Sequence, residues 1–479
     1  IRLGKQVVSW GESTFILGGV NQINPIDVSS FRRPGAEIKE GLIPVNMAFA
    51  SIGLTENLSA EAFYQLGFQE TVISSRDNYF STNDYACEGC GPVESAVGNV
   101  SRSDGGGGIK PSDDGQFGLA FRYFSEELDT EFGFYAMNIH SRMPLLSGIK
   151  ADIDEIGIIV ANPIVDPTST AGSGPGGTVT FDDSVAGLMA AGLDQATATV
   201  SVLASLTTQA VDLGGTNPAY SVGYPEDLQL AGISFATNVK GIALSGELTH
   251  KLDVPFQVNA SQLLGAILQA DATKAWVLEG AGATSEAVGN AMLAASPALQ
   301  DGIEAAVGNS FAYEVALLTD GEMQTGYKTF DVTQLQVTAV KLIDQVLGAS
   351  RFAIVAEAGY TYAHEFDENT ALRFDGNGNL DDTVTQSSWG YRARIIGQYS
   401  NVFAGVNLSP VLSISHDVEG VAPAPGGNFI EDQKVIGLTL NAEYLNTYTA
   451  AVSYTQYSGG KTFNIADRDF ASFTLGMQF

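Results

Sequence analysis

Two cysteines, separated by two residues in the stretch CEGC, are the first residues whose spacing could do chemistry. Cys87 and Cys90 are the chain's only cysteines, and the nearest histidine, His140, lies far along the sequence. A structural zinc site needs about four ligands, so this stretch supplies too few of them. A turn that contains glycine can bring two Cα atoms within about 6 Å of each other. We therefore expect Cys87 and Cys90 to form a local disulfide in an oxidising compartment.

The stretch DGNGNLDD, residues 375–382, carries side-chain oxygens at alternate positions. They belong to Asp375, Asn377, Asn379 and Asp381, which have the 1-3-5-7 spacing of a calcium loop. Leu380 stands where such a loop has glycine, and a clear bidentate glutamate is missing. A weak calcium site and a solvated polar turn therefore both stay open. No other cofactor is indicated.

A tandem arginine pair, Arg32 and Arg33, lies in a segment that also holds several carboxylates. Two guanidinium groups could bind a phosphate or carboxylate headgroup through paired hydrogen bonds. Arginines inside proteins usually satisfy local carboxylates, however. We favour the second interpretation, in which the pair fixes a loop inside a lumen through Glu12, Glu37 or Glu40.

Seven further charged residues take the polar face of alternating segments, and in a transmembrane barrel that face lines the lumen. They are Arg122, Arg392, Arg394, Glu61, Glu247, Glu357 and Glu443. Such charges can set the selectivity of a pore. For each residue taken singly, we favour a place in a ladder of salt bridges that fills the lumen.

Two long segments, residues 184–210 and 261–318, are rich in alanine and leucine and differ from porin loops. In the second segment, apolar residues recur at helical spacing, at Leu263, Leu264, Ile267 and Leu268. Such helices could cover the mouth of a barrel as a hydrophobic entry site, or they could pack only on each other. We predict that these four residues border an apolar pocket or the mouth, because a hydrophobic solute needs apolar contact to leave a membrane.

Composition and motifs argue against several classes of function. Asp and Glu number 54 against 23 Lys and Arg, and nucleic-acid binding needs clustered cations. The four histidines are scattered and a G-x-S-x-G motif is missing, so we expect no enzyme. We find no run of about 20 apolar residues, so a membrane-spanning helix is not expected.

Alternation of apolar with polar or small residues recurs along the chain and predicts strands that separate two environments. Residues 436–444 and 448–455 are one example, an expected hairpin with tyrosines beside its turn. We expect 14 strands, near residues 1–10, 44–56, 60–73, 115–125, 131–142, 228–239, 241–253, 325–345, 351–364, 388–399, 402–416, 433–445, 448–457 and 468–479. The sixth and eighth switch faces midway, which predicts β-bulges there.

The lengths of the connections favour a membrane barrel over a soluble sandwich. Short links, such as residues 239–241 and 445–447, alternate strictly with long ones, such as 143–226 and 255–324. Outer-membrane barrels have short periplasmic turns and long extracellular loops. We therefore predict an all-β fold: one transmembrane antiparallel β-barrel domain over residues 1–479, with 14 to 16 strands and helical insertions in those two long loops.

The chain's last residues, ASFTLGMQF, alternate from Ala471 to Phe479. They look like the C-terminal strand that outer-membrane proteins present to the barrel-assembly machinery. An unpaired apolar edge is a hazard unless a barrel closes on it. The chain begins in the middle of an alternating pattern, so we interpret it as processed or partial. Whether a strand or a pair of strands precedes Ile1, which would give a 16-stranded barrel, stays open.

Several blocks of the sequence resemble a known family. LGKQVVSWGES and the following GGVNQINPIDVSSFRRPGAEIKEGLIPV resemble the outer-membrane domain-of-unknown-function family thirteen-zero-two. The blocks that begin YPEDLQLAGISF and NFIEDQKVIGLT resemble the later strands of the same family and are similar to fatty-acid-channel-like barrels. The resemblance implies a Gram-negative outer-membrane barrel that handles lipidic or other hydrophobic compounds. It also implies a periplasmic lipid-carrier-like lipoprotein and an inner-membrane exporter as partners, besides the outer-membrane lipids, and no catalytic residues.

Two functions from different classes follow. The first is a barrel that transports or exports hydrophobic or lipidic molecules. The second is a structural or assembly barrel with a plugged lumen and an extracellular surface that binds a partner. A passage or lateral opening beside apolar loop helices would favour the first, and a sealed lumen with a flat contact surface would favour the second.

Overall fold

The computed structural model describes most of the chain, and all that follows concerns this part of it. The described residues are 1–32, 36–81, 85–95, 98–150, 219–267, 322–368, 372–376, 384–445, 447–460 and 466–477, with isolated positions between 292 and 318. The side chains of residues 94–99 are not described.

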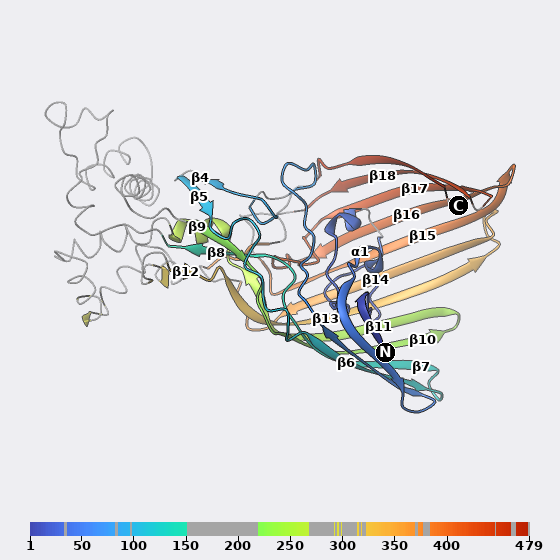
Figure 1. Ribbon diagram of the computed structural model, residues 1–479. Helices are drawn as coiled ribbons and strands as arrows, with labels where there is room; N and C mark the ends of the chain where they lie inside the picture. The colour runs from blue at the N-terminus through green and yellow to red at the C-terminus, as the bar shows by residue number, and fades with distance from the viewer. Residues whose placement is uncertain are drawn as a thin grey trace, which may run out of the picture.

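A 14-stranded antiparallel sheet curls into the wall of a barrel (Figure 1). Its strands, in sheet order, are β1 (Arg2–Gln6), β2 (Val45–Gly53), β3 (Leu58–Gln65), β6 (Phe117–Ser125), β7 (Thr130–Ile139), β10 (Leu228–Val239), β11 (Ile242–Gln257), β13 (Tyr327–Asp344), β14 (Arg351–Ala363), β15 (Ser387–Phe403), β16 (Val406–Glu419), β17 (Lys434–Tyr444), β18 (Tyr448–Ser458) and β19 (Phe470–Met477). Each strand pairs with the next strand of this order, so the predicted transmembrane antiparallel fold and its strands are confirmed.

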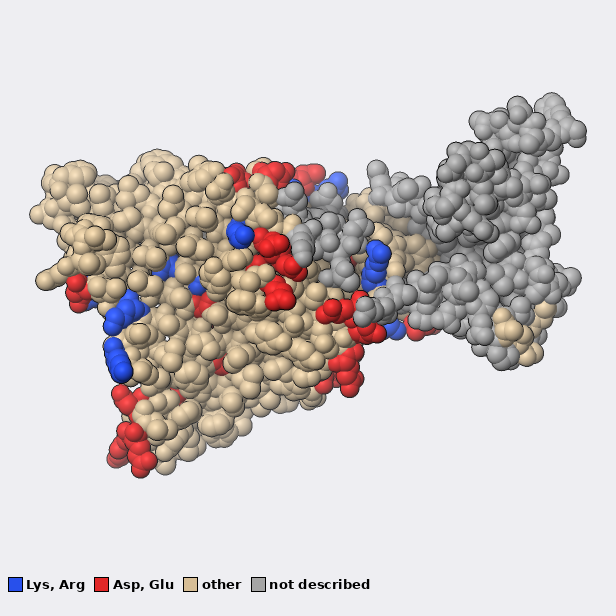
Figure 2. Space-filling view, turned by 180° about the vertical axis from the view of Figure 1, so that it is seen from behind, with Lys and Arg blue, Asp and Glu red and all other residues tan. Residues whose placement is uncertain are grey.

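The two faces of the wall differ as a membrane barrel requires. On β13, the side chains of Gln334 and Gln336 point toward the lumen, and each residue is only 1% exposed. Leu335 between them points outward, and it forms a row with Tyr360 of β14 and Trp389 of β15. Apolar side chains of this kind cover the outside, and Figure 2 shows few charged residues along the length of the wall. The outside therefore suits a hydrocarbon environment and the inside a polar one.

The strands β1 and β19 are the two edges of this sheet. Among the described residues, no pairing between them is found. Near the long-loop end, the connection that follows β3 contacts the start of β19, because the rings of Phe80 and Phe470 lie 5.4 Å apart and the Tyr79 hydroxyl donates to the Asp467 carbonyl over 2.7 Å. Phe479 of the predicted C-terminal strand lies outside the described residues.

The β-bulges in the structure do not all lie at the positions predicted from the alternating sequence pattern. β10 pairs with β7 and β11 in unbroken register, so the bulge expected near 228–239 was wrong. The register shift lies instead on β11, where Lys251 and Val254 flank two residues that oppose Asp331 of β13. Asp253 has a φ of 54°, which breaks the extended backbone at this point. Further shifts occur between β15 and β16. β15 continues through the expected link at 400–401 to Phe403, and β16 begins at Val406.

Residues 7–44 leave β1, fold into the lumen and return to β2, and we call this segment the plug (Figure 1). It contains the short helices η1 (Val28–Arg32) and α1 (Ile38–Gly41). Its apolar side chains Val8, Trp10, Val20 and Ile23 pack on Phe63, Met137 and other inward residues of β2, β3, β6, β7 and β10. The lumen is thus filled at this level by the chain itself.

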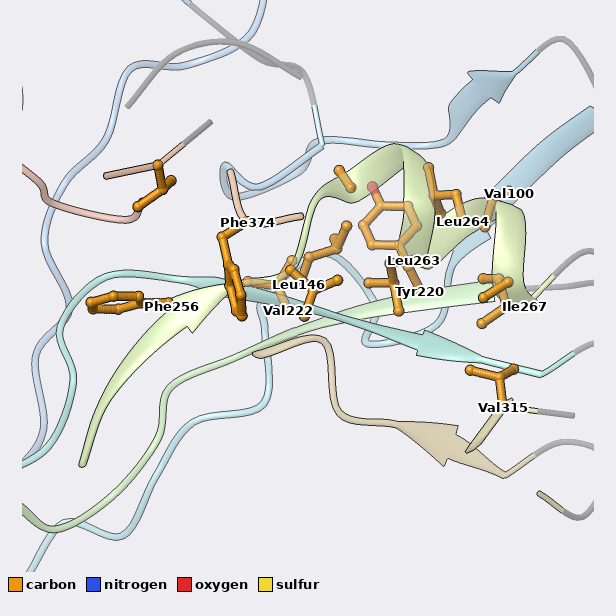
Figure 3. Packing of buried hydrophobic residues seen from close by; sticks show 14 of the residues in the cluster. Val100, Leu146, Tyr220, Val222, Phe256, Leu263, Leu264, Ile267, Val315 and Phe374 are labelled. Carbon is orange, nitrogen blue, oxygen red and sulfur yellow. The ribbon is translucent and has the colours of Figure 1, made fainter. Parts of the chain in front are cut away.

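A second layer, which we call the cap, covers the long-loop end of the barrel. It is a five-stranded sheet in the order β12 (Met323–Gln324), β8 (Leu145–Ile149), β9 (Ala219–Gly223), β5 (Gly98–Arg102) and β4 (Val93–Ser95), together with the helical residues 260–267. Figure 3 shows Leu146, Tyr220 and Val222 packed beneath the helix, beside Phe256 and Phe374. No helix among the described residues is long and apolar enough to cross a membrane.

Candidate functional site: a cavity between plug and barrel wall

Two carboxylates on the barrel wall hold the plug by its backbone. Glu247 of β11 accepts hydrogen bonds from the amides of Glu12 and Val20, at 2.5 and 2.9 Å. Glu357 of β14 accepts from three successive amides, of Thr14, Phe15 and Ile16, at 2.9, 2.6 and 2.8 Å. Hydrogen bonds to an ionised acceptor are among the stronger ones in proteins. Glu247 and Glu357, both predicted to line the lumen, therefore anchor the plug that fills it.

Neutral and cationic donors hold the next turn of the plug by its carbonyls. The Leu17 carbonyl accepts from the side-chain amides of Gln334 and Asn428, each at 2.7 Å. The Gly18 carbonyl accepts from Nζ of Lys251 at 3.0 Å. Residues far apart in sequence thus fix the backbone of the plug from three directions.

A cavity of about 370 Å³ lies between the plug, the long-loop ends of the wall strands and the loop 422–428. Volumes of about 300–1,000 Å³ are usual for small-molecule sites. Its lining includes the apolar residues Ile26, Phe31, Leu228, Val254 and Phe256. It also includes amide and cationic groups. This mixture suits a molecule with an apolar body and a polar end.

Arg142 is a buried cation in this lining. Its guanidinium donates to the carbonyls of Ile23 and Gln69, each at 2.9 Å, and to the side-chain oxygens of Gln65 and Gln116. Its Nε has no hydrogen-bond partner. Burial lowers the pKa of Arg142 to about 10, so the side chain keeps its charge at neutral pH.

The other predicted lumen charges form ion pairs or hydrogen bonds at the wall. Arg122 pairs with Glu131 at 3.1 Å, Arg392 with Asp417 at 2.7 Å, and Arg394 with Glu37 of the plug at 3.6 Å. Glu61 accepts from the Trp10 indole N–H at 2.7 Å, and Glu443 takes the inner face of β17 opposite Thr449. The salt bridges of the favoured interpretation are thus formed by the three arginines, whereas Glu61, Glu247 and Glu357 accept hydrogen bonds from the plug.

Arg32 lies apart from the carboxylates that were expected to pair with it. Its Nη2 donates to the Ser74 hydroxyl at 3.0 Å, and its guanidinium lies 4.5 Å from the centre of the Phe80 ring. Glu37 pairs instead with Lys39 and Arg394. Arg33 lies outside the described residues.

The predicted hydrophobic loop residues are core residues of the cap. Leu263, Leu264 and Ile267 are 0%, 9% and 1% exposed, and Figure 3 shows them packed near Val100, Tyr220 and Val315. They do not line the described cavity. The cap strands cover this apolar stripe, so these residues do not border that cavity, and the prediction that they lie at the mouth of the barrel stays a prediction. Leu268 lies outside the described residues.

Asp375 of the predicted calcium loop contacts the start of the cap helix. Its carboxylate accepts from the side chain of Asn259 at 3.0 Å and from the amide of Ala260, where the cap helix begins. Burial raises the pKa of Asp375 to about 7. Asn377, Asn379 and Asp381 lie outside the described residues, and among the residues that the structure describes there is no cluster of three metal-ligating side chains.

The Cys87–Cys90 disulfide forms, with 5.2 Å between the two Cα atoms. Arg102 of β5 donates to the carbonyl of Cys87 and pairs with Asp104 at 2.7 Å. Asp104 also accepts from the amides of Val222 and Gly106, and these hydrogen bonds together with Arg102 lower its pKa. The disulfide is thus part of the cap, where a buried ion pair connects its turn to β9.

A family model described as a protein of unknown function, DUF1302, matches residues 1–479. The chain belongs to this family. The resemblance seen in the sequence is thereby confirmed over its whole length. No curated protein matches the sequence.

Solved barrels are similar to this chain at low identity. A FadL homologue of Pseudomonas aeruginosa is 8% identical, with 99% of this chain and 82% of that chain covered and a TM-score of 0.30. A mutant of the ferric enterobactin receptor PfeA, also of Pseudomonas aeruginosa, is 9% identical over 86% of this chain and 50% of its own, with a TM-score of 0.29. The toluene transporter TodX of Pseudomonas putida is 8% identical over 99% and 91%, with a TM-score of 0.21.

Lys251 and Arg142 are the site residues that sequence reasoning missed. Lys251 follows Glu247 and Thr249 on the inward face of β11, so the alternation could have identified it as a lumen charge. Arg142 follows the end of β7 and gave no periodic signal. The long-range folding of the plug, which brings Ile23 to Arg142 and Gly18 to Lys251, has no signature in either local sequence.

Proposed function

We propose that the chain is an outer-membrane barrel that transports a hydrophobic or lipidic compound, with the short turns in the periplasm and the cap outside the cell. The observation that carries the proposal is the cavity between the plug and the barrel wall, with the apolar lining residues Leu228, Val254 and Phe256. Burial of apolar surface there would stabilise a bound hydrocarbon by about 25 cal/mol per Å². The plug, held by Glu247 and Glu357, would then control the way through the lumen.

The experiment is mass spectrometry of the compounds that co-purify with the barrel from native membranes. The variant Val254→Trp fills the cavity, and Val402→Trp adds the same ring at an exposed position near a short turn. The proposal expects a hydrophobic compound with the wild type and with Val402→Trp, and a several-fold lower amount with Val254→Trp. Equal amounts in all three proteins would contradict it.

A second candidate is a structural barrel with a partner on its cap, and one observation favours it. Leu263 and Ile267 are buried in the cap core, so the cap is a packed layer and not an open apolar lid. A periplasmic lipid-carrier-like lipoprotein and an inner-membrane exporter would be partners of the transporter and not of this alternative. A barrel that retains no hydrophobic compound but captures a protein through its cap would support the second candidate.

A further inference from the structure

The cavity between the plug and the barrel wall has an unusual charge for this protein. The chain carries 54 acidic and 23 basic residues, yet the described residues that line the cavity include Arg142 and Lys251 and no Asp or Glu. Both cations are at the cavity because β7 ends just before Arg142 and β11 bulges just after Lys251. A positive cavity in an acidic chain calls for a specific explanation.

Neither cation has a carboxylate partner within the part of the chain that the structure describes. Arg142 donates only to carbonyl and side-chain amide oxygens, and its buried Nε has no hydrogen-bond partner. Lys251 donates one hydrogen bond, to the Gly18 carbonyl, although an ammonium group has three donors. Glu247, on the same face of β11, interacts electrostatically with Lys251, but its oxygens accept hydrogen bonds from the plug amides and the Gln336 side chain.

A buried charge without a counter-ion is costly, and proteins usually pair such groups. A ligand that brings a negative charge to this cavity would remove that cost and would also use the remaining donors of Lys251. The apolar side of the cavity, at Ile26, Leu228 and Phe256, would hold a hydrocarbon chain at the same time. An uncharged hydrocarbon would satisfy only the second of these two surfaces.

We propose that the cavity binds an amphiphile with an anionic headgroup, a carboxylate or a phosphate, which Lys251 contacts directly beside the fixed charge of Arg142. This inference rests on the proposed function and narrows its substrate class. The apolar chain lies against apolar lining residues such as Leu228 and Phe256, and the headgroup lies at Lys251, near Gly18 of the plug. The barrel therefore distinguishes ligands by headgroup charge.

The test is calorimetric titration of the purified barrel, in one nonionic detergent, with three probes of equal chain length: dodecanoate, dodecyl phosphate and dodecanol. The wild type is expected to bind at least one of the anions about tenfold or more tightly than dodecanol, as charged hydrogen bonds of about 1.5–3 kcal/mol imply. The stronger of the two anions identifies the headgroup. In Lys251→Met this preference is expected to fall to about twofold or less, and in Lys251→Arg it should persist.

Two matched variants separate charge from structure. Lys341→Met removes a lysine that also donates to a glycine carbonyl at 3.0 Å, that of Gly241, but at the short-turn end. Its affinities should equal those of the wild type. Gln334→Met removes a plug hydrogen bond beside Lys251 without removing charge, so it should change the affinities for the three probes by the same factor.

Each other outcome has a distinct meaning. Equal wild-type affinities for dodecanol and the anions would overturn the headgroup inference and leave hydrophobic transport standing. A loss of anion preference in Gln334→Met as large as in Lys251→Met would also overturn it, because Lys251 would then act only by positioning the plug. Failure of the wild type to bind any probe would contradict the proposed function itself.

Discussion

Gly19 lies where the plug comes closest to the barrel wall. A Cβ atom at this position would lie 1.7 Å from Oε1 of Glu247 and 2.3 Å from Nε2 of Gln336. Gly19→Ala should therefore displace the carboxylate and break its bond to the Val20 amide, at a cost of about 1–3 kcal/mol. A folded barrel migrates as a compact form in gel electrophoresis when the sample is not boiled. We expect the Gly19→Ala variant to lose this compact form after heating to a lower temperature than the wild type. Gly53→Ala, with no atom within 4 Å of the added Cβ, should leave that temperature unchanged.

The raised pKa of Asp375 predicts that the stability of the cap depends on pH. Burial raises its pKa from 3.8 to about 7, so between these values the folded cap binds a proton that the unfolded chain releases. The stabilising contribution is therefore complete below about pH 4 and is lost as the pH rises toward 7, by at most about 4 kcal/mol. Thermal melting from pH 4 to 8 should show this slope for the wild type. The variant Asp375→Asn should lose this pH dependence. If the melting temperatures of the wild type and the variant changed with pH in parallel, Asp375 would not be its source.

At the scale of elements, the plug depends on two carboxylates. Glu357→Gln leaves one acceptor oxygen for three plug amides and turns an amide donor toward them. We expect a looser plug and a higher single-channel conductance in planar bilayers. Glu131→Gln is the control, because Glu131 pairs with Arg122 at the wall and accepts no plug amide. Equal conductance of the Glu357→Gln and Glu131→Gln variants would show that Glu357 does not hold the lumen closed.

Strands and plug differ in how far the sequence determines them. The wall strands were predictable because each buries one face and exposes the other to lipid, as Gln334 and Leu335 do on β13. The sequence did not indicate the bulge at Lys251, since this bulge follows from a positive φ at Asp253 and not from a change of face in the alternating pattern. The plug has no periodicity, and its position is set by contacts such as Glu357 to Phe15 that join distant parts of the chain.

The cap was missed for a related reason. Its strands are short, β4 and β12 having three and two residues, so no alternation could develop in them. The apolar stripe of Leu263, Leu264 and Ile267 was recognised, but periodicity identifies only the buried face of a helix and not what covers it. The cavity beneath the cap could therefore be found only in the folded chain.

For the whole molecule, the sorting of connections predicts which end faces the cell exterior. Leu347, 82% exposed in a short turn, and Thr325, exposed beside the cap strand β12, lie at opposite ends of β13. The native cysteines are joined in a disulfide, so a single introduced cysteine would be the one reactive thiol.

In intact cells, a membrane-impermeant maleimide should label Thr325→Cys and should label Leu347→Cys only after the outer membrane is permeabilised. Both variants should be labelled equally in the purified protein, which controls for reactivity. The reverse pattern would place the cap in the periplasm, and with it the cavity and its two cations, so that a ligand would meet Lys251 before it passed the plug from the cell side.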